Sequence, residues 1–159
     1  MRIAVAGDHA GYDLKQAAVG WIRELGHQVV DLGPSEYDPN DDYPDFALAL
    51  GNAVSAGEAE RGVLTCGSGV GASVTANKVP GVRAAMCHDT YSAHQGVEHD
   101  DMNVLCLGGR IVGIALAREL LESFLSARFT GEERHVRRLN KVKAIEEEVG
   151  GTNPAPRTK

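Results

Sequence analysis

Residues 61–78, RGVLTCGSGVGASVTANK, contain a short apolar strand that ends at Cys66 and runs directly into a glycine-rich turn. The turn, Gly67-Ser68-Gly69-Val70-Gly71, allows positive φ angles and can direct successive N–H groups toward one point. A helix that begins near Val70 would add its positive end to these donors. Such a turn can bind a phosphate or an oxyanion that forms during a reaction. A strand that leads through a tight turn into a helix is also the repeating unit of an α/β fold.

Apolar runs of strand length recur along the chain, at 3–6, 28–32, 63–66, 82–87 and 103–107. They are nearly continuous in apolar character rather than alternating, as expected for strands that are buried on both faces of a parallel sheet. Helix-like segments lie between them, at 12–26, 43–57, 90–100 and 110–129. This alternation predicts a doubly wound, Rossmann-like α/β domain with a five-stranded parallel sheet flanked by helices.

Residues 131–150 predict one more helix, with Val136, Leu139, Val142 and Ile145 along one side. No strand follows this helix, so it need not pack on its own sheet and is expected to reach a partner subunit. We predict a single domain over residues 1–149 and a disordered tail over 150–159, where small, polar and proline residues dominate.

The composition, with 43% hydrophobic and 24% charged residues, is typical of a soluble globular chain. The net charge of −6 argues against a general nucleic-acid binder, because phosphate backbones attract basic surfaces. No apolar run is long enough to span a bilayer, and the apolar stretch at the N-terminus is too short for a secretory signal. Three cysteines without a CxxC pair suit a reducing compartment, so we expect a cytoplasmic protein without a zinc site.

Ligands in open α/β sheets bind beyond the carboxyl ends of the strands. The segments that follow the predicted strands are 7–11 (GDHAG), 42–43, 66–71, 88–89 and 108–110. Among them, Cys66 has the most reactive setting, because neighbouring backbone N–H groups favour a thiolate. Free cysteines usually pack as small hydrophobes, which is our prediction for Cys87 and Cys106.

Three other positions carry acid–base groups. Asp8 and His9 lie between two glycines. One interpretation is that Asp8 caps a helix and that His9 is exposed without a function. The favoured interpretation is that the glycines let a substrate approach both side chains closely. His99 has acids on both sides that favour its charged form, which fits either acid–base chemistry or an exposed surface histidine.

A basic cluster begins at Arg134 and includes His135, Arg137 and Arg138. Arg134 and Arg138 are four residues apart and therefore neighbours on one helix face. The cluster is either a solvated face paired with nearby glutamates or a clamp for phosphate, which guanidinium groups bind in a bidentate manner. In so acidic a chain the clamp is favoured, and a small phosphorylated metabolite fits it better than nucleic acid.

Two other functions remain open from these residues alone. Gly67, Gly69 and Ala72 match a G-x-G-x-x-A pattern, and Asp89 follows about 20 residues later, as in an NAD-dependent dehydrogenase. A non-catalytic phosphate-binding module would also use the turn and the arginines. The dinucleotide interpretation is weaker, because the turn follows the third strand and leaves room for only a short helix.

Five segments, in this order, closely resemble the ribose-5-phosphate isomerase B family and its relatives, the galactose-6-phosphate isomerase subunits. They are GDHAG (7–11), DDYP (41–44), CGSGVGASVTANKVPGVRAA (66–85), HDDMNVLCLGGR (99–110) and RHVRR (134–138), within a resemblance over about residues 1–148. The resemblance implies a doubly wound fold that forms homodimers, and in some members tetramers, with active sites shared between subunits. It also implies an aldose–ketose isomerase of sugar phosphates that works through an enediolate and needs no metal or other cofactor.

The resemblance suggests a role for each matched residue. Cys66 is similar to the base that moves a proton between C1 and C2, since position 72, where a related subgroup carries a glutamate base, is Ala here. Ser68 resembles the hydroxyl that shuttles protons between O1 and O2, and His99, assisted by Asp8, resembles the group that opens the furanose ring. The backbone N–H groups of Gly67, Gly69, Val70 and Gly71 are expected to bind the enediolate oxygens. The implied substrate and phosphate ligands are His9, Tyr43, Arg110, Arg134, His135 and Arg138.

One position departs from the family pattern. Members that act on pentose phosphates usually have Asn after the ring-opening histidine, and this chain has Asp100. A carboxylate accepts hydrogen bonds but does not donate them, so Asp100 alters how substrate hydroxyls are bound. Ribose 5-phosphate is the first expectation, with tetrose phosphates such as erythrulose 4-phosphate and hexose phosphates as alternatives.

Overall fold

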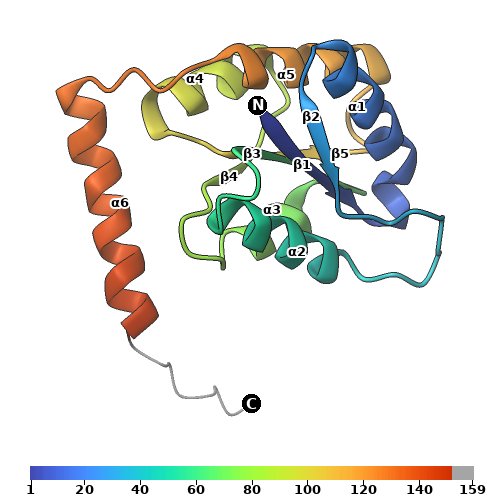
Figure 1. Cartoon of the computed structure of the whole chain (residues 1–159), viewed down its shortest axis with the longest axis horizontal. Coiled ribbons are helices and arrows are strands. Elements are labelled where there is room, and N and C mark those ends of the chain that lie inside the picture. The colour runs from blue at the N-terminus through green and yellow to red at the C-terminus, as the bar shows by residue number, and fades with distance from the viewer. Residues whose placement is uncertain (152–159) are drawn as a thin grey trace.

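Five parallel strands form the sheet, in the order β2-β1-β3-β5-β4, in a computed structural model that describes residues 1–151 (Figure 1). The strands are β1 (Arg2–Gly7), β2 (Gln28–Asp31), β3 (Arg61–Cys66), β4 (Ala84–Met86) and β5 (Val104–Gly108). The helices are η1 (His9–Gly11), α1 (Tyr12–Glu24), α2 (Tyr43–Ser55), α3 (Val70–Ala76), α4 (Thr90–Asp100), α5 (Ile114–Ser126) and α6 (Glu133–Gly151). The predicted doubly wound, five-stranded parallel sheet is therefore confirmed.

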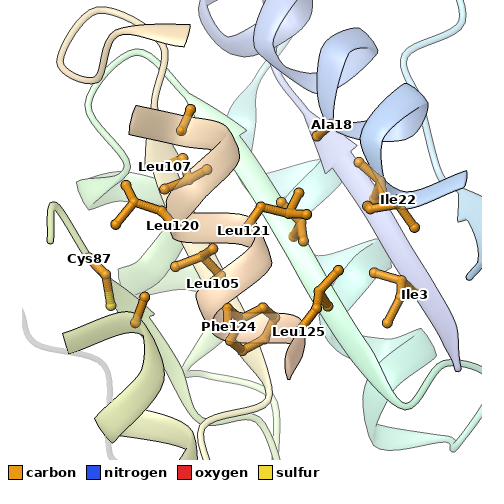
Figure 2. Close-up of a cluster of buried hydrophobic side chains, with 14 of the residues drawn as sticks. Ile3, Ala18, Ile22, Cys87, Leu105, Leu107, Leu120, Leu121, Phe124 and Leu125 are labelled. Atoms are coloured by element: carbon orange, nitrogen blue, oxygen red, sulfur yellow. The ribbon is translucent and has the colours of Figure 1, made fainter. Parts of the chain in front are cut away.

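Helices cover both faces of the sheet, with α1, α4 and α5 on one face and α2 and α3 on the other (Figure 1). Successive side chains of a strand point to opposite faces, so Leu105 packs with the first set of helices and Cys106 with the second. On the first face, Leu105 lies among Leu120, Leu121 and Phe124 of α5 (Figure 2). Each such fully buried side chain stabilises the fold by about 1.5–3 kcal/mol relative to exposure.

Close backbone packing brings η1 against the end of β3. A Cβ atom at Gly11 would lie 2.4 Å from the carbonyl carbon of Thr65, so only glycine allows this approach. The Thr65 hydroxyl donates to the carbonyl of Gly11 at 2.9 Å, and the backbone N–H of Asp8 donates to the carbonyl of Thr65 at 3.2 Å. The segment that contains Asp8 and His9 is thereby fixed beside Cys66.

The strand order decides which loops meet at each edge of the sheet. β5 lies between β3 and β4, and its Gly108 pairs with Cys66 at the carboxyl edge while its Val104 pairs with Gly62 at the amino edge. Helix α4 ends at Asp100, four residues before β5 begins, so its last turn lies at the amino edge. Helix α5 follows β5 and also runs back to the amino edge, where α6 begins.

Helix α6 stands beside the sheet rather than on either face of it (Figure 1). Of its predicted apolar stripe, Leu139 is buried, while Val136, Val142 and Ile145 are 37%, 54% and 60% exposed. The helix continues to Gly151, two residues into the segment predicted as a tail, and residues 152–159 lie outside the described part of the chain. Within residues 1–151, no helix combines the length and apolar character needed to cross a bilayer.

Candidate active site

Cys66 lies at the end of β3 with its sulfur facing the glycine-rich turn. The Sγ atom accepts a hydrogen bond from the backbone N–H of Gly69 at 3.0 Å, and Gly69 has the left-handed φ of 84° that such a turn requires. The next N–H, of Val70, donates to the hydroxyl of Ser68 at 3.3 Å. An N–H donor directed at sulfur stabilises negative charge on it. Cys66 itself is 4% exposed, so the thiol is nearly covered within one chain.

The two other cysteines differ from Cys66 in their surroundings. Burial raises the pKa of Cys87 to about 11 and raises the pKa of Cys106 above its usual range. Both side chains are buried among apolar neighbours, which confirms the prediction that they pack as small hydrophobes.

Asp8 and His9 occupy the turn between β1 and η1. The Asp8 side chain is buried and accepts from the N–H of Gly11 at 3.0 Å, so it caps η1 as the alternative interpretation proposed. His9 is bound by Asp41, whose Oδ1 lies 2.7 Å from the ring Nδ1 and accepts from the backbone N–H of His9 at 2.9 Å. The hydrogen bond that the Asp41 carboxylate accepts from the ring, and then the charges of Asp41 and Asp8, raise the pKa of His9.

Tyr43 and Arg110 both lie beside the glycine-rich turn that follows Cys66. A Cβ atom added at Gly71 would lie 2.7 Å from the Tyr43 ring, which shows how closely the ring covers the turn. At Gly67, an added Cβ would lie 3.6 Å from a terminal nitrogen of Arg110. We call Asp8, His9, Tyr43, residues 66–71 and Arg110 the carboxyl-edge cluster. It joins a thiol, a hydroxyl, backbone donors, an imidazole and a guanidinium.

His99 lies elsewhere, in the last turn of α4, where its ring stacks on His135 with ring centroids 4.1 Å apart. The side-chain nitrogen of Gln95 lies 2.7 Å from His99 Nδ1. His135 is 1% exposed, and neither ring nitrogen has a hydrogen-bond partner within the described residues. The ring that was expected to lie near the phosphate therefore lies beneath His99 in this chain, and its proposed contact with phosphate remains a prediction.

Asp100 is the last residue of α4, and Arg134 and Arg138 lie in the first turns of α6. Asp100 and Arg138 line a groove of about 580 Å³ between α6 and the segment from Asn77 to Ala85. Arg134 is largely exposed and pairs with Glu132 at 2.8 Å, as the solvated-face interpretation predicted for one arginine of the cluster. We call His99, Asp100, Arg134, His135 and Arg138 the amino-edge cluster.

The two clusters lie at opposite edges of one sheet. Strand β5, which runs from the amino to the carboxyl edge, has five residues and spans roughly 13 Å at about 3.3 Å per residue. One chain therefore does not bring His99 or the α6 arginines to Cys66. The shared site expected for the arginines remains a prediction, and His99 and Asp100 lie at the same amino edge as the arginines.

Two features suggested an NAD-dependent dehydrogenase from the sequence, Asp89 and the G-x-G-x-x-A pattern of the glycine-rich turn. Asp89 caps α4 by accepting from the N–H of Ser92 at 2.7 Å, and α3, after the glycine turn, has only seven residues. Across residues 1–151, no group of three or more His, Cys, Asp or Glu side chains is arranged to hold a metal ion.

Sequence reasoning missed two partners of site histidines. Asp41 lies in the DDYP segment and Gln95 in the predicted helix over 90–100, and neither residue has a role predicted from the sequence. The Gln95 contact was available from sequence, because Gln95 and His99 are four residues apart on a predicted helix. The Asp41 contact joins residues 32 positions apart through a loop, and no local pattern indicates it.

Comparison with known proteins identifies the relatives of this chain. A family model described as ribose/galactose isomerase matches residues 3–142. Ribose-5-phosphate isomerase B of Escherichia coli is 40% identical over 146 residues, covering 92% of this chain and 97% of the relative. A D-erythrulose-4-phosphate isomerase of Pectobacterium atrosepticum is 41% identical over 134 residues, covering 82% and 86%. The solved structure of Clostridium thermocellum ribose-5-phosphate isomerase B superposes with a TM-score of 0.90 at 42% identity, covering 94% and 99%.

Proposed function

The chain belongs to the ribose/galactose isomerase family, and we propose that it interconverts ribose 5-phosphate and ribulose 5-phosphate with Cys66 as the base. The family makes it an aldose–ketose isomerase of sugar phosphates, a reaction that moves one proton between neighbouring carbons and needs no external oxidant. The hydrogen bond from the Gly69 N–H to Cys66 Sγ carries the proposal. It places the base beside a backbone donor that stabilises negative charge.

The proposed reaction begins with the open-chain aldehyde. The Cys66 thiolate takes the C2 proton, and the electron pair moves to the carbonyl oxygen O1 to form a cis-enediolate. N–H groups of residues 67–71 bind the developing charge, Ser68 passes a proton between O1 and O2, and the Cys66 thiol returns its proton to C1. A positioned base of this kind contributes about 10²–10⁴-fold to the rate, and each preorganised oxyanion donor contributes about 10²–10³-fold.

A second copy of the chain completes this site in the proposal. The amino-edge cluster of the second copy would supply His99, which opens the furanose ring. It would also supply Arg134 and Arg138, which bind the phosphate. His9 and Arg110 of the first copy bind the same phosphate. Support comes from the division of these groups between opposite edges of the sheet. Further support comes from exposed apolar side chains that a partner could cover, Val142 and Ile145 on α6 and Val70 and Val74 on α3. A homodimer with shared sites is the minimal assembly.

A tetrose phosphate is the second candidate substrate. The Pectobacterium relative is named for erythrulose 4-phosphate, and this chain carries Asp100 in the groove beside Arg138. A tetrose esterified at O4 has no hydroxyl left to close a furanose ring, so its isomerisation requires no ring opening. The Asp100 side chain forms no hydrogen bond or ion pair among residues 1–151, which leaves its carboxylate available to substrate hydroxyls or to Arg138.

Initial rates on erythrulose 4-phosphate, ribose 5-phosphate and a hexose 6-phosphate test the proposal. We expect turnover of at least one of them by the wild-type chain and its near loss in Cys66→Ala. Tight NADH binding without isomerisation would contradict the function, and turnover that survives in Cys66→Ala would contradict the base.

We also propose that the protein works in the cytoplasm. Phosphorylated sugars are intracellular metabolites, and the three cysteines are free, as expected in a reducing compartment.

A further inference from the structure

We propose that Asp41 is a positioning residue that holds His9 as a cationic hydrogen-bond donor toward the substrate phosphate. The inference rests on the proposed function, in which His9 is a phosphate ligand, and it gives a role to a residue outside both clusters.

One carboxylate oxygen of Asp41 fixes both the backbone and the ring of His9. Asp41 Oδ1 accepts from the His9 backbone N–H at 2.9 Å and lies 2.7 Å from Nδ1 of the ring. Because an ionised carboxylate only accepts hydrogen bonds, the proton of this contact belongs to Nδ1. Nε2 is then the ring nitrogen left for a ligand, and its orientation is set by the Asp41 contact.

A charged Asp41 carboxylate in this buried position lowers the stability of the fold unless an opposite charge lies next to it. Its side chain is 9% exposed, and its second oxygen, Oδ2, is buried without a hydrogen-bond partner among residues 1–151. A buried charge is stabilised chiefly by an opposite charge close to it. The geometry therefore favours the ion pair of a carboxylate with protonated His9 over a neutral pair.

Desolvation acts against the protonated form of His9, while the second nearby carboxylate favours it. Asp8 precedes it in the turn, and its charge also raises the pKa of His9. Tyr37, from the loop between β2 and α2, meets the His9 ring edge-on with centroids 6.4 Å apart. His9 thus keeps its proton to higher pH than an ordinary histidine, and a protonated ring makes a stronger, charge-assisted hydrogen bond to a phosphate oxygen.

The loop that carries Asp41 is anchored to α1. Lys15, which is fully buried, pairs with Asp31 at 2.6 Å and donates to the carbonyl of Pro34 at 3.1 Å. The Tyr12 hydroxyl donates to the carbonyl of Ser35 at 3.2 Å. These contacts hold the start of the loop and so limit the positions that Asp41 can adopt.

Asp41→Asn tests the inference, because asparagine keeps an oxygen acceptor for Nδ1 but removes the charge. Asp42→Asn is the matched control, since Asp42 is the exposed neighbour and its side chain makes no capping bond to α2. The His9 pKa is measured by NMR, with the signal assigned by its loss in His9→Gln. Phosphate affinity is measured by titration with inorganic phosphate and by KM across pH.

We expect Asp41→Asn to lower the His9 pKa and to weaken phosphate binding roughly tenfold above neutral pH, the difference between a charge-assisted and a neutral hydrogen bond. At pH values low enough to protonate His9 in both proteins, the affinities should converge. The kcat should change little, because His9 does not touch the reacting carbons. Asp42→Asn should match wild type in all three measurements.

An unchanged His9 pKa in Asp41→Asn would overturn the proposal. So would an equal loss of phosphate affinity when Asp41→Asn is added to His9→Gln, since a residue that acts through His9 has no further effect once His9 is gone. Thermal melting of each variant identifies unfolding as a separate cause. The NMR and phosphate titrations need no turnover, so they decide this inference even if the proposed isomerase activity fails.

Discussion

Mixing two inactive variants tests whether the active site is divided between subunits. The first variant, Cys66→Ala, lacks the carboxyl-edge base, and the second, Arg134→Ala with Arg138→Ala, lacks the amino-edge phosphate ligands. In a heterodimer of the two, one site carries both defects and the other carries neither. Activity should therefore reappear on mixing.

The size of the recovery follows from counting sites. Random pairing of equal amounts gives about half heterodimers, each with one intact site out of two, so the mixture should reach about a quarter of wild-type activity per site. The variants are coexpressed or refolded together, and heterodimers are separated by two different affinity tags. Rates are measured below KM, where the loss of phosphate ligands is fully visible.

A pair of variants from the same edge is the internal control. Arg110 lies beside the Cys66 turn within one chain, where an added Cβ at Gly67 would be 3.6 Å from its guanidinium. In a heterodimer of Cys66→Ala with Arg110→Ala, each site keeps one defect, so no intact site forms. The idea of a divided site fails if the opposite-edge pair shows no recovery in purified heterodimers, or if both pairs recover equally.

Three further outcomes follow from the structure. Cys66→Ala should lower kcat by about 10²–10⁴-fold and leave inorganic phosphate affinity unchanged, as measured by steady-state kinetics with phosphate as inhibitor; a loss confined to KM would contradict the base. His99→Asn should slow ribose 5-phosphate isomerisation more than that of erythrulose 4-phosphate, and equal losses would remove its ring-opening role. Gly11→Ala should destabilise the fold by about 1–3 kcal/mol, because its Cβ would lie 2.4 Å from the Thr65 carbonyl carbon. Calorimetry measures this against Gly20→Ala in α1, where an added Cβ meets no atom within 4 Å, and equal melting temperatures would contradict it.

The fold was predictable because each of its signals is local. The strands are continuous apolar runs, and α1 and α5 have the spacing of amphipathic helices, so the parallel sheet follows from general rules. The strand ends lie within two residues of the predicted ones, as for β4, which was predicted over 82–87 and is observed over Ala84–Met86. The position of β5 between β3 and β4 depends on long-range pairing, and no sequence pattern specified it.

The carboxyl-edge position of Asp8, Cys66 and Arg110 was also predictable, since Cys66 ends a strand and the other two each follow one. The position of His99 could be predicted from the sequence, because it lies in the last turn of a helix that returns to the amino edge. Its contact with His135 could not be predicted. That contact depends on how α6 leaves the sheet, which the α6 sequence alone does not determine. The pairing of Asp41 with His9 is similar, since a loop brings the two residues together.

The proposed division of the site between two subunits would explain why members of this family act on different sugar phosphates. In the proposed mechanism the proton transfer involves only C1 and C2, which are alike in tetroses, pentoses and hexoses, and it uses groups of the carboxyl edge. The differences among these substrates lie in ring closure, hydroxyl positions and distance to the phosphate, which the proposal gives to the partner's amino edge. A change such as Asp100 in place of Asn would then alter substrate preference without disturbing Cys66 or the backbone donors, because the altered side chain enters the site from the other subunit.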